Sequence, residues 1–289
     1  MLYRCVQLLS IVGVLVLGNA QAADFNARDF FSAPAGTSAA IVYLPVTRAN
    51  EFRGANGSDK HADLSVNALV YRQIWFSDLC GTLCTPQFVV PYVDIDARLP
   101  GANGSAHERG IGDPQIGGTL FFINDPQSRT YSGLLTMLSV PVGEYHGRNP
   151  DVSPGTNRWG LTFNYNYTQG VGEKWVLEAN LEAQLYGKND DYYGVDFEQK
   201  PLYRLQAFAS YDFTPATYGA LRLIHADGGE LKINGNAIDD THQRYTQVGF
   251  EVGHWLDRSN QVLLGLTRNV ASDNAFVQNN LLLRFVHVF

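Results

Sequence analysis

Much of this chain places an apolar residue at every second position. In W-V-L-E-A-N-L-E-A-Q-L-Y, from Trp175 to Tyr186, apolar side chains alternate with glutamate, asparagine and glutamine. The segments 158–169 and 202–213 repeat the design. A period of two predicts a β-strand, because successive side chains of a strand point to opposite faces. We therefore expect strands with one apolar and one polar face.

Alternating segments recur from residue 37 to the end of the chain, and there are about twelve of them. They cover 37–49, 63–76, 87–98, 115–124, 131–142, 158–169, 174–186, 202–213, 217–227, 243–256, 261–271 and 276–289. Short turn sequences such as 169–174 alternate along the chain with longer polar loops such as 146–157 and 227–240. This layout is typical of bacterial outer-membrane proteins. The sequence predicts an all-β fold, a closed antiparallel transmembrane β-barrel with short periplasmic turns, long extracellular loops and both termini in the periplasm.

The last predicted strand ends the chain on Phe289, with Leu281, Leu283 and Phe285 on the same face. A final strand with a terminal aromatic residue resembles the sorting signal that many outer-membrane proteins present to the barrel assembly machinery. We expect that machinery, outer-membrane lipid and lipopolysaccharide among the partners of this protein.

The start of the chain is typical of an export signal, because an apolar run precedes Ala20-Gln21-Ala22, a site of the small-x-small type that signal peptidase cleaves. That run is too short to span a bilayer. We expect residues 1–22 to be a signal peptide, 23–36 a periplasmic or lumenal segment, and 37–289 the transmembrane barrel. In an oxidising compartment, the remaining pair Cys80 and Cys84 predicts a disulfide.

Composition argues against several other classes of protein. The formal net charge of −7 makes an exported protein a poor partner for nucleic acid. No apolar run of spanning length follows the signal, which argues against a helical membrane protein. We expect no metal and no cofactor, because two cysteines alone leave a zinc site incomplete.

In the strands from residue 158 onward, the polar face is expected to line the lumen. Its charged members are Glu178, Glu182, Arg204, Arg222, Glu251 and Arg284. Acidic and basic side chains share this face, so their charges can offset one another. About twelve strands leave room for a narrow pore only.

Two earlier segments, 119–124 and 132–142, are apolar on both faces, so one apolar set must point inward. The candidates are Phe121 or Phe122, together with either Leu134 and Leu138 or Leu135 and Met137. Two interpretations stay open. These residues give the pore an apolar lining, or a plug such as the N-terminal segment 24–31 packs against them inside the barrel.

Two glycine motifs lie in the same half of the chain. R-G-I-G-D-P-Q-I-G-G (109–118) has a G-x-G-D core, and S-V-P-V-G-E-Y (139–145) contains P-x-G. The glycines permit a tight backbone path, the aspartate can cap a turn, and the proline fixes the start of the next strand. We expect these residues to organise a loop, with a gate or solute contact as the alternative. They are Gly110, Gly112, Asp113 and Pro114.

These motifs and the strand layout resemble the outer-membrane family called Putative MetA-pathway of phenol degradation. The resemblance implies an outer-membrane channel for passive uptake of small, largely hydrophobic or aromatic molecules. It implies no enzymatic activity.

A barrel hydrolase and a structural or adhesive barrel are the alternatives. Asp94 and Asp96 lie on one face of a predicted strand, and Asp240 and His242 lie near the outer end of another. They resemble the acidic pair and the Asp-His pair of omptin proteases, in which histidine activates water. Both patterns are short and generic, so we favour the channel.

Prolines interrupt the first half of the predicted wall at Pro45, Pro91 and Pro141. Proline lacks the N–H group that a strand ladder needs, and a closed barrel has no edge to accommodate it. We expect a local break there that opens a lateral window from the lumen to the membrane. The alternative is that each proline merely bends its strand.

Overall fold

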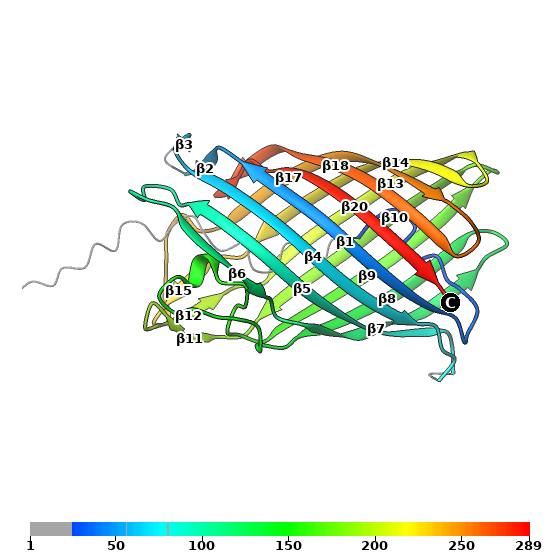
Figure 1. Ribbon diagram of the computed structural model, residues 1–289, viewed down its shortest axis with the longest axis horizontal. Helices are drawn as coiled ribbons and strands as arrows, with labels where there is room; N and C mark the ends of the chain where they lie inside the picture. Colours follow the sequence, from blue (N-terminus) through cyan, green and yellow to red (C-terminus); the bar gives the residue numbers. More distant parts are fainter. Residues whose placement is uncertain (1–24, 56, 80) are drawn as a thin grey trace, which may run out of the picture.

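Twelve strands formed by the described residues close into one antiparallel barrel (Figure 1). The computed structural model describes residues 25–55, 57–79 and 81–289. The wall strands, in chain order, are β1 (Ser38–Ala49), β4 (Asp63–Trp75), β5 (Cys84–Arg98), β7 (Gln115–Asp125), β8 (Thr130–Ser139), β9 (Gly160–Val171), β10 (Trp175–Tyr186), β13 (Leu202–Thr214), β14 (Thr217–Gly228), β17 (Gln243–Trp255), β18 (Asn260–Asp273) and β20 (Asn279–Val288).

The first and last wall strands pair with each other and close the sheet. The β1–β20 register runs from Ala39↔Val288 to Arg48↔Asn279, and the other edge of β1 pairs with β4. Closure lets neighbouring strands satisfy backbone groups that lipid cannot hydrogen-bond. The predicted all-β class, the closed barrel and the antiparallel order are confirmed.

The two ends of the barrel differ as predicted. Short turns and the C-terminus lie at one end, and the long connections lie at the other (Figure 1). The long connections add two small sheets, one of β2 (Phe52–Gly54), β3 (Gly57–Asp59) and β19 (Ala275–Phe276), the other of β11 (Asn189–Tyr192), β12 (Val195–Gln199), β15 (Leu231–Ile233) and β16 (Asn236–Ala237). In outer-membrane barrels the long loops are extracellular and the short turns periplasmic.

Two predicted strands extend three residues too far. The fifth wall strand, β8, ends at Ser139, so Pro141 lies beyond it and interrupts no strand. The last wall strand begins at Asn279 and not at residue 276, because Ala275 and Phe276 pair instead with Arg53 and Phe52.

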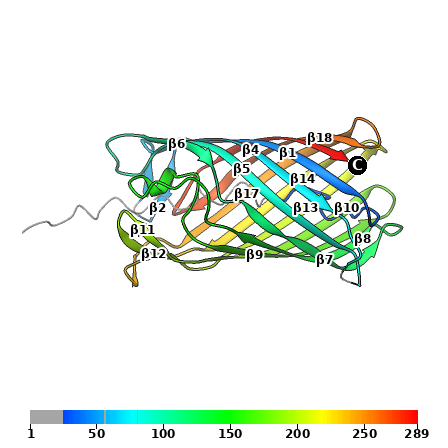
Figure 2. The ribbon, with the colours of Figure 1, turned by 60° about the horizontal axis from the view of Figure 1, so that its bottom comes forward.

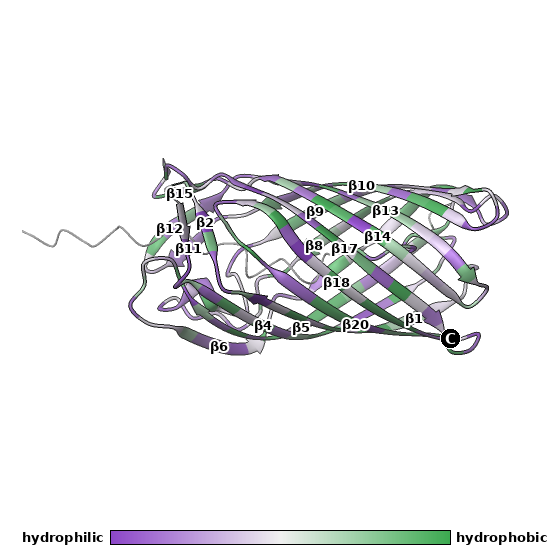
Figure 3. Ribbon diagram, turned by 90° about the horizontal axis from the view of Figure 1, so that it is seen from above, coloured by the Kyte–Doolittle hydropathy of each residue, from purple (hydrophilic) through white to green (hydrophobic). Residues whose placement is uncertain are grey.

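Side chains alternate between the inside and the outside of the wall. Along β10, Val176 and Glu178 are buried inside, while Leu177 and Leu181 are 46% and 60% exposed on the outer face. The strands change repeatedly between hydrophobic and hydrophilic residues along their length (Figure 3). The exposed apolar face fits a lipid environment, and the barrel lies in the bacterial outer membrane.

The described residues contain no helix that is long and apolar enough to cross a membrane. The expected signal peptide, residues 1–22, lies outside the described residues, and so does Cys80. The cleavage and the Cys80–Cys84 disulfide therefore stay predictions.

Candidate functional site

Residues 25–31 form a turn inside the periplasmic half of the barrel. Glu251 accepts hydrogen bonds from the Asn26 side chain and the Ala27 N–H, each 2.9 Å long. Glu178 accepts from the N–H of Arg28 at 2.9 Å. We call residues 25–31 the plug. It is held by two carboxylates that project from β17 and β10, two wall strands that are separated by β14 and β13.

Two ion pairs add to these anchors. Arg284 of β20 donates to Asp29 at 2.5 Å, and Arg28 donates to Asp212 of β13 at 2.6 Å. The Arg28 guanidinium also lies 4.2 Å from the centre of the Tyr218 ring. Charge-assisted hydrogen bonds of this kind are stronger than neutral ones, so the plug is firmly seated.

The apolar side of the plug packs on the apolar half of the wall. Phe25 and Phe30 lie 5.2 Å apart, ring centre to ring centre. Both belong to one buried cluster with Val89, Leu135 and Met137. Of the two interpretations of the apolar inner face, the structure agrees with an N-terminal segment packed against it.

The structure also decides which apolar sets point inward. Phe121, Leu135 and Met137 are 3–5% exposed and lie inside. Phe122 is 57% exposed and its ring stacks on outward-facing Tyr165, because it follows inward-facing Phe121 along the strand.

Three residues named as lumen candidates are therefore misplaced. Phe122 faces outward, and Leu134 and Leu138 are only partly buried and alternate with the buried Leu135 and Met137. Because both faces of β8 are apolar, the alternation pattern could not distinguish them.

The six charged lumen candidates all lie inside, and the exposure of each is 6% or less. Glu182 pairs with Arg204 at 3.1 Å, and Glu251 pairs with Arg222 at 3.2 Å. Glu178 and Arg284 bind the plug, and Glu251 binds it as well. Opposite charges are thus matched locally. Whether these side chains contact a passing solute stays a prediction.

The wall is interrupted beside Pro91. The first part of β5 pairs with β7 as far as Val89↔Gln115. Its outer part pairs with β6 (Ala106–Ile111) from Tyr92↔Ile111 onward. β6 ends the order of the sheet, so its other edge has no strand beside it within the described part of the chain (Figure 2). By contrast, Pro45 stays within β1 and keeps its register with Leu282 of β20.

Residues 140–157, which we call the lateral loop, occupy the place next to β6. The Glu144 N–H donates to the Ile111 carbonyl at 2.8 Å, and the Val140 N–H donates to the Pro114 carbonyl at 2.9 Å. This hydrogen bonding is sparser than a strand ladder. The lateral loop therefore closes the wall without being part of the sheet.

The Gly-Asp motif fastens the lateral loop. The Asp113 carboxylate accepts hydrogen bonds from the Gly143 N–H at 2.9 Å and from the Thr156 N–H and hydroxyl at 2.7 Å each. A Cβ atom at Gly110 would lie 2.5 Å from the Glu144 carboxyl carbon, so a side chain at this position would displace the Glu144 carboxylate. Pro114 lies directly before β7 on the far side of the turn. The predicted loop-organising geometry is present, while a gating role stays a proposal.

Apolar residues flank this interruption on both sides. Ile95, Ala97 and Val152 are at most 1% exposed, and they belong to one buried cluster in the outer half of the barrel. On the membrane side, Ile111 and Val142 are 48% and 70% exposed. A path across the wall at this point would begin and end on apolar residues.

The residues considered as candidates for a hydrolase active site do not lie together in the structure. Asp94 contacts His107 at 3.2 Å, whereas His242 contacts Asp227 and Glu230 at 3.1 Å each. Among the described residues, no group of three or more His, Cys, Asp or Glu side chains could hold a metal ion.

Sequence reasoning missed the anchoring residues of the plug, Asn26 and Asp29, and the amides of the lumen. Asn166 donates to Asn180 at 2.6 Å. The alternation along β9 and β10 placed these amides on the inner face, but it gave no reason to single them out.

Comparison with known proteins agrees with this geometry. The model of the family Putative MetA-pathway of phenol degradation matches residues 46–285. The COG4313 outer membrane channel from Pseudomonas putida F1 is 25% identical, with a TM-score of 0.85 over 92% of this chain and 100% of that chain. No curated protein matches this chain.

Two autotransporter barrels are more distant. The transport unit of AIDA-I from Escherichia coli is 9% identical, with a TM-score of 0.57 over 95% of each chain. The translocator domain of NalP from Neisseria meningitidis is 7% identical, with a TM-score of 0.55 over 89% of this chain and 90% of that one. These two show the fold alone. The family match spans most of the chain, and this protein therefore belongs to the outer-membrane family Putative MetA-pathway of phenol degradation.

Proposed function

We propose that this protein is a channel for passive uptake of small, largely hydrophobic or aromatic molecules, which leave the barrel sideways into the membrane. The family and the similar outer membrane channel from Pseudomonas putida support a channel. The interrupted wall beside β6 carries the lateral part of the proposal.

The straight route through the lumen is closed to a solute by the plug. Its anchors on Glu178, Glu251 and Arg284 are buried, so its displacement breaks several charge-assisted hydrogen bonds. An apolar solute offers these groups no replacement partners. Leaving them unpaired inside the barrel is costly.

The sideways route needs only the lateral loop to move. A solute that enters from the extracellular end first meets the apolar cluster around Ile95 and Val152. It then passes between β6 and the lateral loop. The barrier there consists of the backbone hydrogen bonds from Val140 and Glu144 and of the contacts that Glu108 of β6 makes with His146 and Asn149. The hydrogen bonds of Asp113 to the lateral loop add to it. On the far side it reaches the apolar surface of Ile111 and Val142 and then lipid.

A cross-link between Ile111 and Glu144 tests the route. The N–H of Glu144 binds the carbonyl of Ile111, so the two backbones are adjacent, and a disulfide can join residues whose Cα atoms lie about 4.4–6.8 Å apart. We expect Ile111→Cys/Glu144→Cys, when oxidised, to block uptake of labelled phenol and toluene by cells that express it. Reduction should restore uptake, and Ile111→Cys alone should behave like the parent protein under both conditions.

A second variant separates the two routes. Deletion of residues 25–31 opens the lumen but leaves the lateral loop in place. If the oxidised cross-link left uptake unchanged while this deletion raised it strongly, the solute would pass straight through and the lateral exit would be wrong. If neither protein supported uptake above cells without the barrel, the channel proposal itself would fail.

A further inference from the structure

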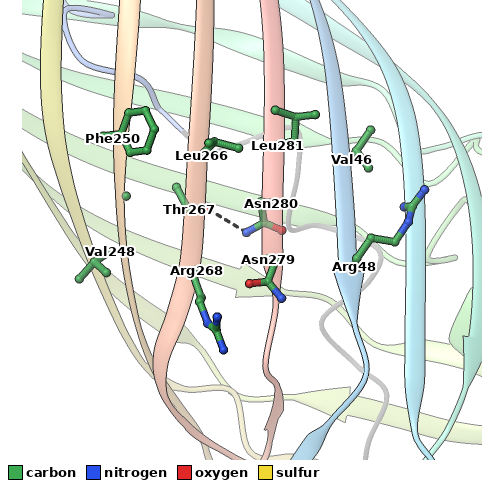
Figure 4. Close-up of a pocket in the computed structure, with 11 residues that line it drawn as sticks. Val46, Arg48, Val248, Phe250, Leu266, Thr267, Arg268, Asn279, Asn280 and Leu281 are labelled. Carbon is green, nitrogen blue, oxygen red and sulfur yellow. Dashed lines mark hydrogen bonds between the residues drawn. The ribbon is translucent and has the colours of Figure 1, made fainter.

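A shallow groove of about 550 Å³ lies on the outer wall, away from the interruption. It crosses β17, β18, β20 and β1. Its apolar row consists of Phe250, Leu266, Leu281 and Val46, which project from four neighbouring strands (Figure 4). Phe250, Leu266 and Leu281 are 39–48% exposed, and they belong to the outward-facing sets of their strands. The groove therefore faces lipid and not the lumen.

A polar row lies directly beside the apolar one. Asn279 is in register with Arg48 on one side and with Arg268 on the other. Strands lie about 4.8 Å apart, which places the Cα atoms of the two arginines about 10 Å from each other. Arg48 precedes the last residue of β1, and Asn279 begins β20. The polar row thus marks the extracellular end of the groove.

The polar row is basic, and its charge is not balanced by the protein. Arg48 donates to the Asn67 side chain at 2.8 Å and to backbone carbonyls. In the part of the chain that the structure describes, the Arg268 side chain has neither a hydrogen bond nor an ion pair, and no acidic residue lines the groove. Guanidinium groups bind phosphate well because their N–H groups match its oxygens in a fork geometry.

The apolar surface continues toward the middle of the membrane. The next outward row in register is Leu44, Leu283, Leu264 and Val252, and these side chains are 41–46% exposed. Two successive rows, each four strands wide, offer room for several acyl chains below one headgroup. This is the arrangement of an amphiphile with its phosphate at the extracellular rim.

We propose that this groove binds one molecule of lipopolysaccharide, with a lipid A phosphate on Arg48 and Arg268 and acyl chains on the two apolar rows. The occupant is lipopolysaccharide and not a phospholipid, because the basic row lies at the extracellular end, where the outer leaflet presents multiply acylated lipids with more than one phosphate. This site is separate from the lateral exit, and it holds whether or not the barrel transports hydrophobic solutes.

Native mass spectrometry of the full barrel in detergent tests the site. We expect the parent protein to retain one bisphosphorylated lipid A, and to bind it more tightly than its monophosphorylated form or phosphatidylglycerol. Arg268→Ala should lower the apparent affinity about tenfold, the size expected for one charge-assisted contact. Arg48→Ala/Arg268→Ala should lower it further. Because the Arg268 side chain makes no hydrogen bond or ion pair with the described residues, its replacement should leave the fold intact.

Arg109→Ala is the matched control, since Arg109 is an exposed arginine of β6 outside the groove. It should bind lipid A like the parent protein. Three results would overturn the proposal. The first is that the Arg48 and Arg268 variants bind lipid A as tightly as the parent protein, and the second is that Arg109→Ala loses as much affinity as they do. The third is that the parent protein binds phosphatidylglycerol as tightly as lipid A. Inorganic phosphate serves as the probe without acyl chains, and its binding with the same affinity as lipid A would also refute a lipid site.

Discussion

At the residue scale, Asp113 shows how one carboxylate can determine the path of a long loop. It joins the start of β7 to Gly143 and Thr156, which follow it by 30 and 43 residues. The G-x-G-D sequence predicts a capped turn, because aspartate beside glycine favours one. It cannot reveal that the capped groups belong to another loop, since that contact depends on the whole barrel.

Replacing Asp113 with alanine should loosen the lateral loop. The N–H groups of Gly143 and Thr156 lose their acceptor, at a cost of about 1–3 kcal/mol for each buried group that stays unsatisfied. We expect faster amide hydrogen exchange across residues 140–157 and little change in β10. Asp190→Asn, at an exposed carboxylate of β11, is the control. Unchanged exchange in Asp113→Ala would mean that the backbone hydrogen bonds alone hold the loop.

His242 gives the outer loops a dependence on pH. Its ring lies 3.1 Å from both Glu230 and Asp227. The hydrogen bond to Glu230 raises the pKa of His242 above its ordinary value of 6.5, and Asp227 adds to the effect, while burial opposes it. Because the pKa of His242 is raised in the folded state, its contacts with the two carboxylates stabilise the loop fully below about pH 6.5. This stabilisation is lost as the pH rises through the higher folded-state pKa.

We therefore expect the 229–242 loop to be better protected in acid than in base. Limited proteolysis between about pH 5 and pH 9 should show cleavage of this loop rising with pH. The trend should vanish in His242→Asn and persist in His61→Asn, which changes an exposed loop histidine. The same trend in His242→Asn would assign the pH dependence to another group.

At the element scale, the wall strands could be predicted well and the plug could not. Strand alternation is local, so β10 and β13 were expected at 174–186 and 202–213 and lie at Trp175–Tyr186 and Leu202–Thr214. The plug has no regular period. Its position depends on Glu178 and Glu251, which lie 150 and 224 residues away from their plug partners Arg28 and Ala27.

The plug anchors can be tested one at a time. Glu178→Gln keeps the shape of the side chain but removes the charge that holds the Arg28 N–H. Hydrogen bonds to charged groups contribute about 1.5–3 kcal/mol, so the displaced plug should become more populated. Single-channel recordings should then show more frequent current steps than in the parent protein. Glu173→Gln, in an exposed periplasmic turn, should have no effect, and equal recordings from both variants would show that Glu178 is not an anchor.

At the scale of the whole molecule, charge pairing governs what an open lumen would select. Glu182 pairs with Arg204 and Glu251 with Arg222, so four of the six lumen charges cancel without the plug. The other two, Glu178 and Arg284, have opposite signs and face Arg28 and Asp29, which also cancel each other. Removing the plug therefore leaves the balance of charge unchanged.

Removal of the plug should therefore change the conductance but not the ion selectivity. In planar bilayers the intact barrel should pass small currents, because the plug fills the periplasmic half of the lumen. Deletion of residues 25–31 should raise the conductance severalfold. The reversal potential in a salt gradient should nevertheless stay near zero, because ion selectivity follows the sign of the electric field in the lumen and not the width of the lumen. Arg284→Ala in the deletion variant leaves one carboxylate unmatched, so it should shift the reversal potential toward cation selectivity. Strong selectivity in the deletion variant alone would show that the paired charges do not cancel along the solute path.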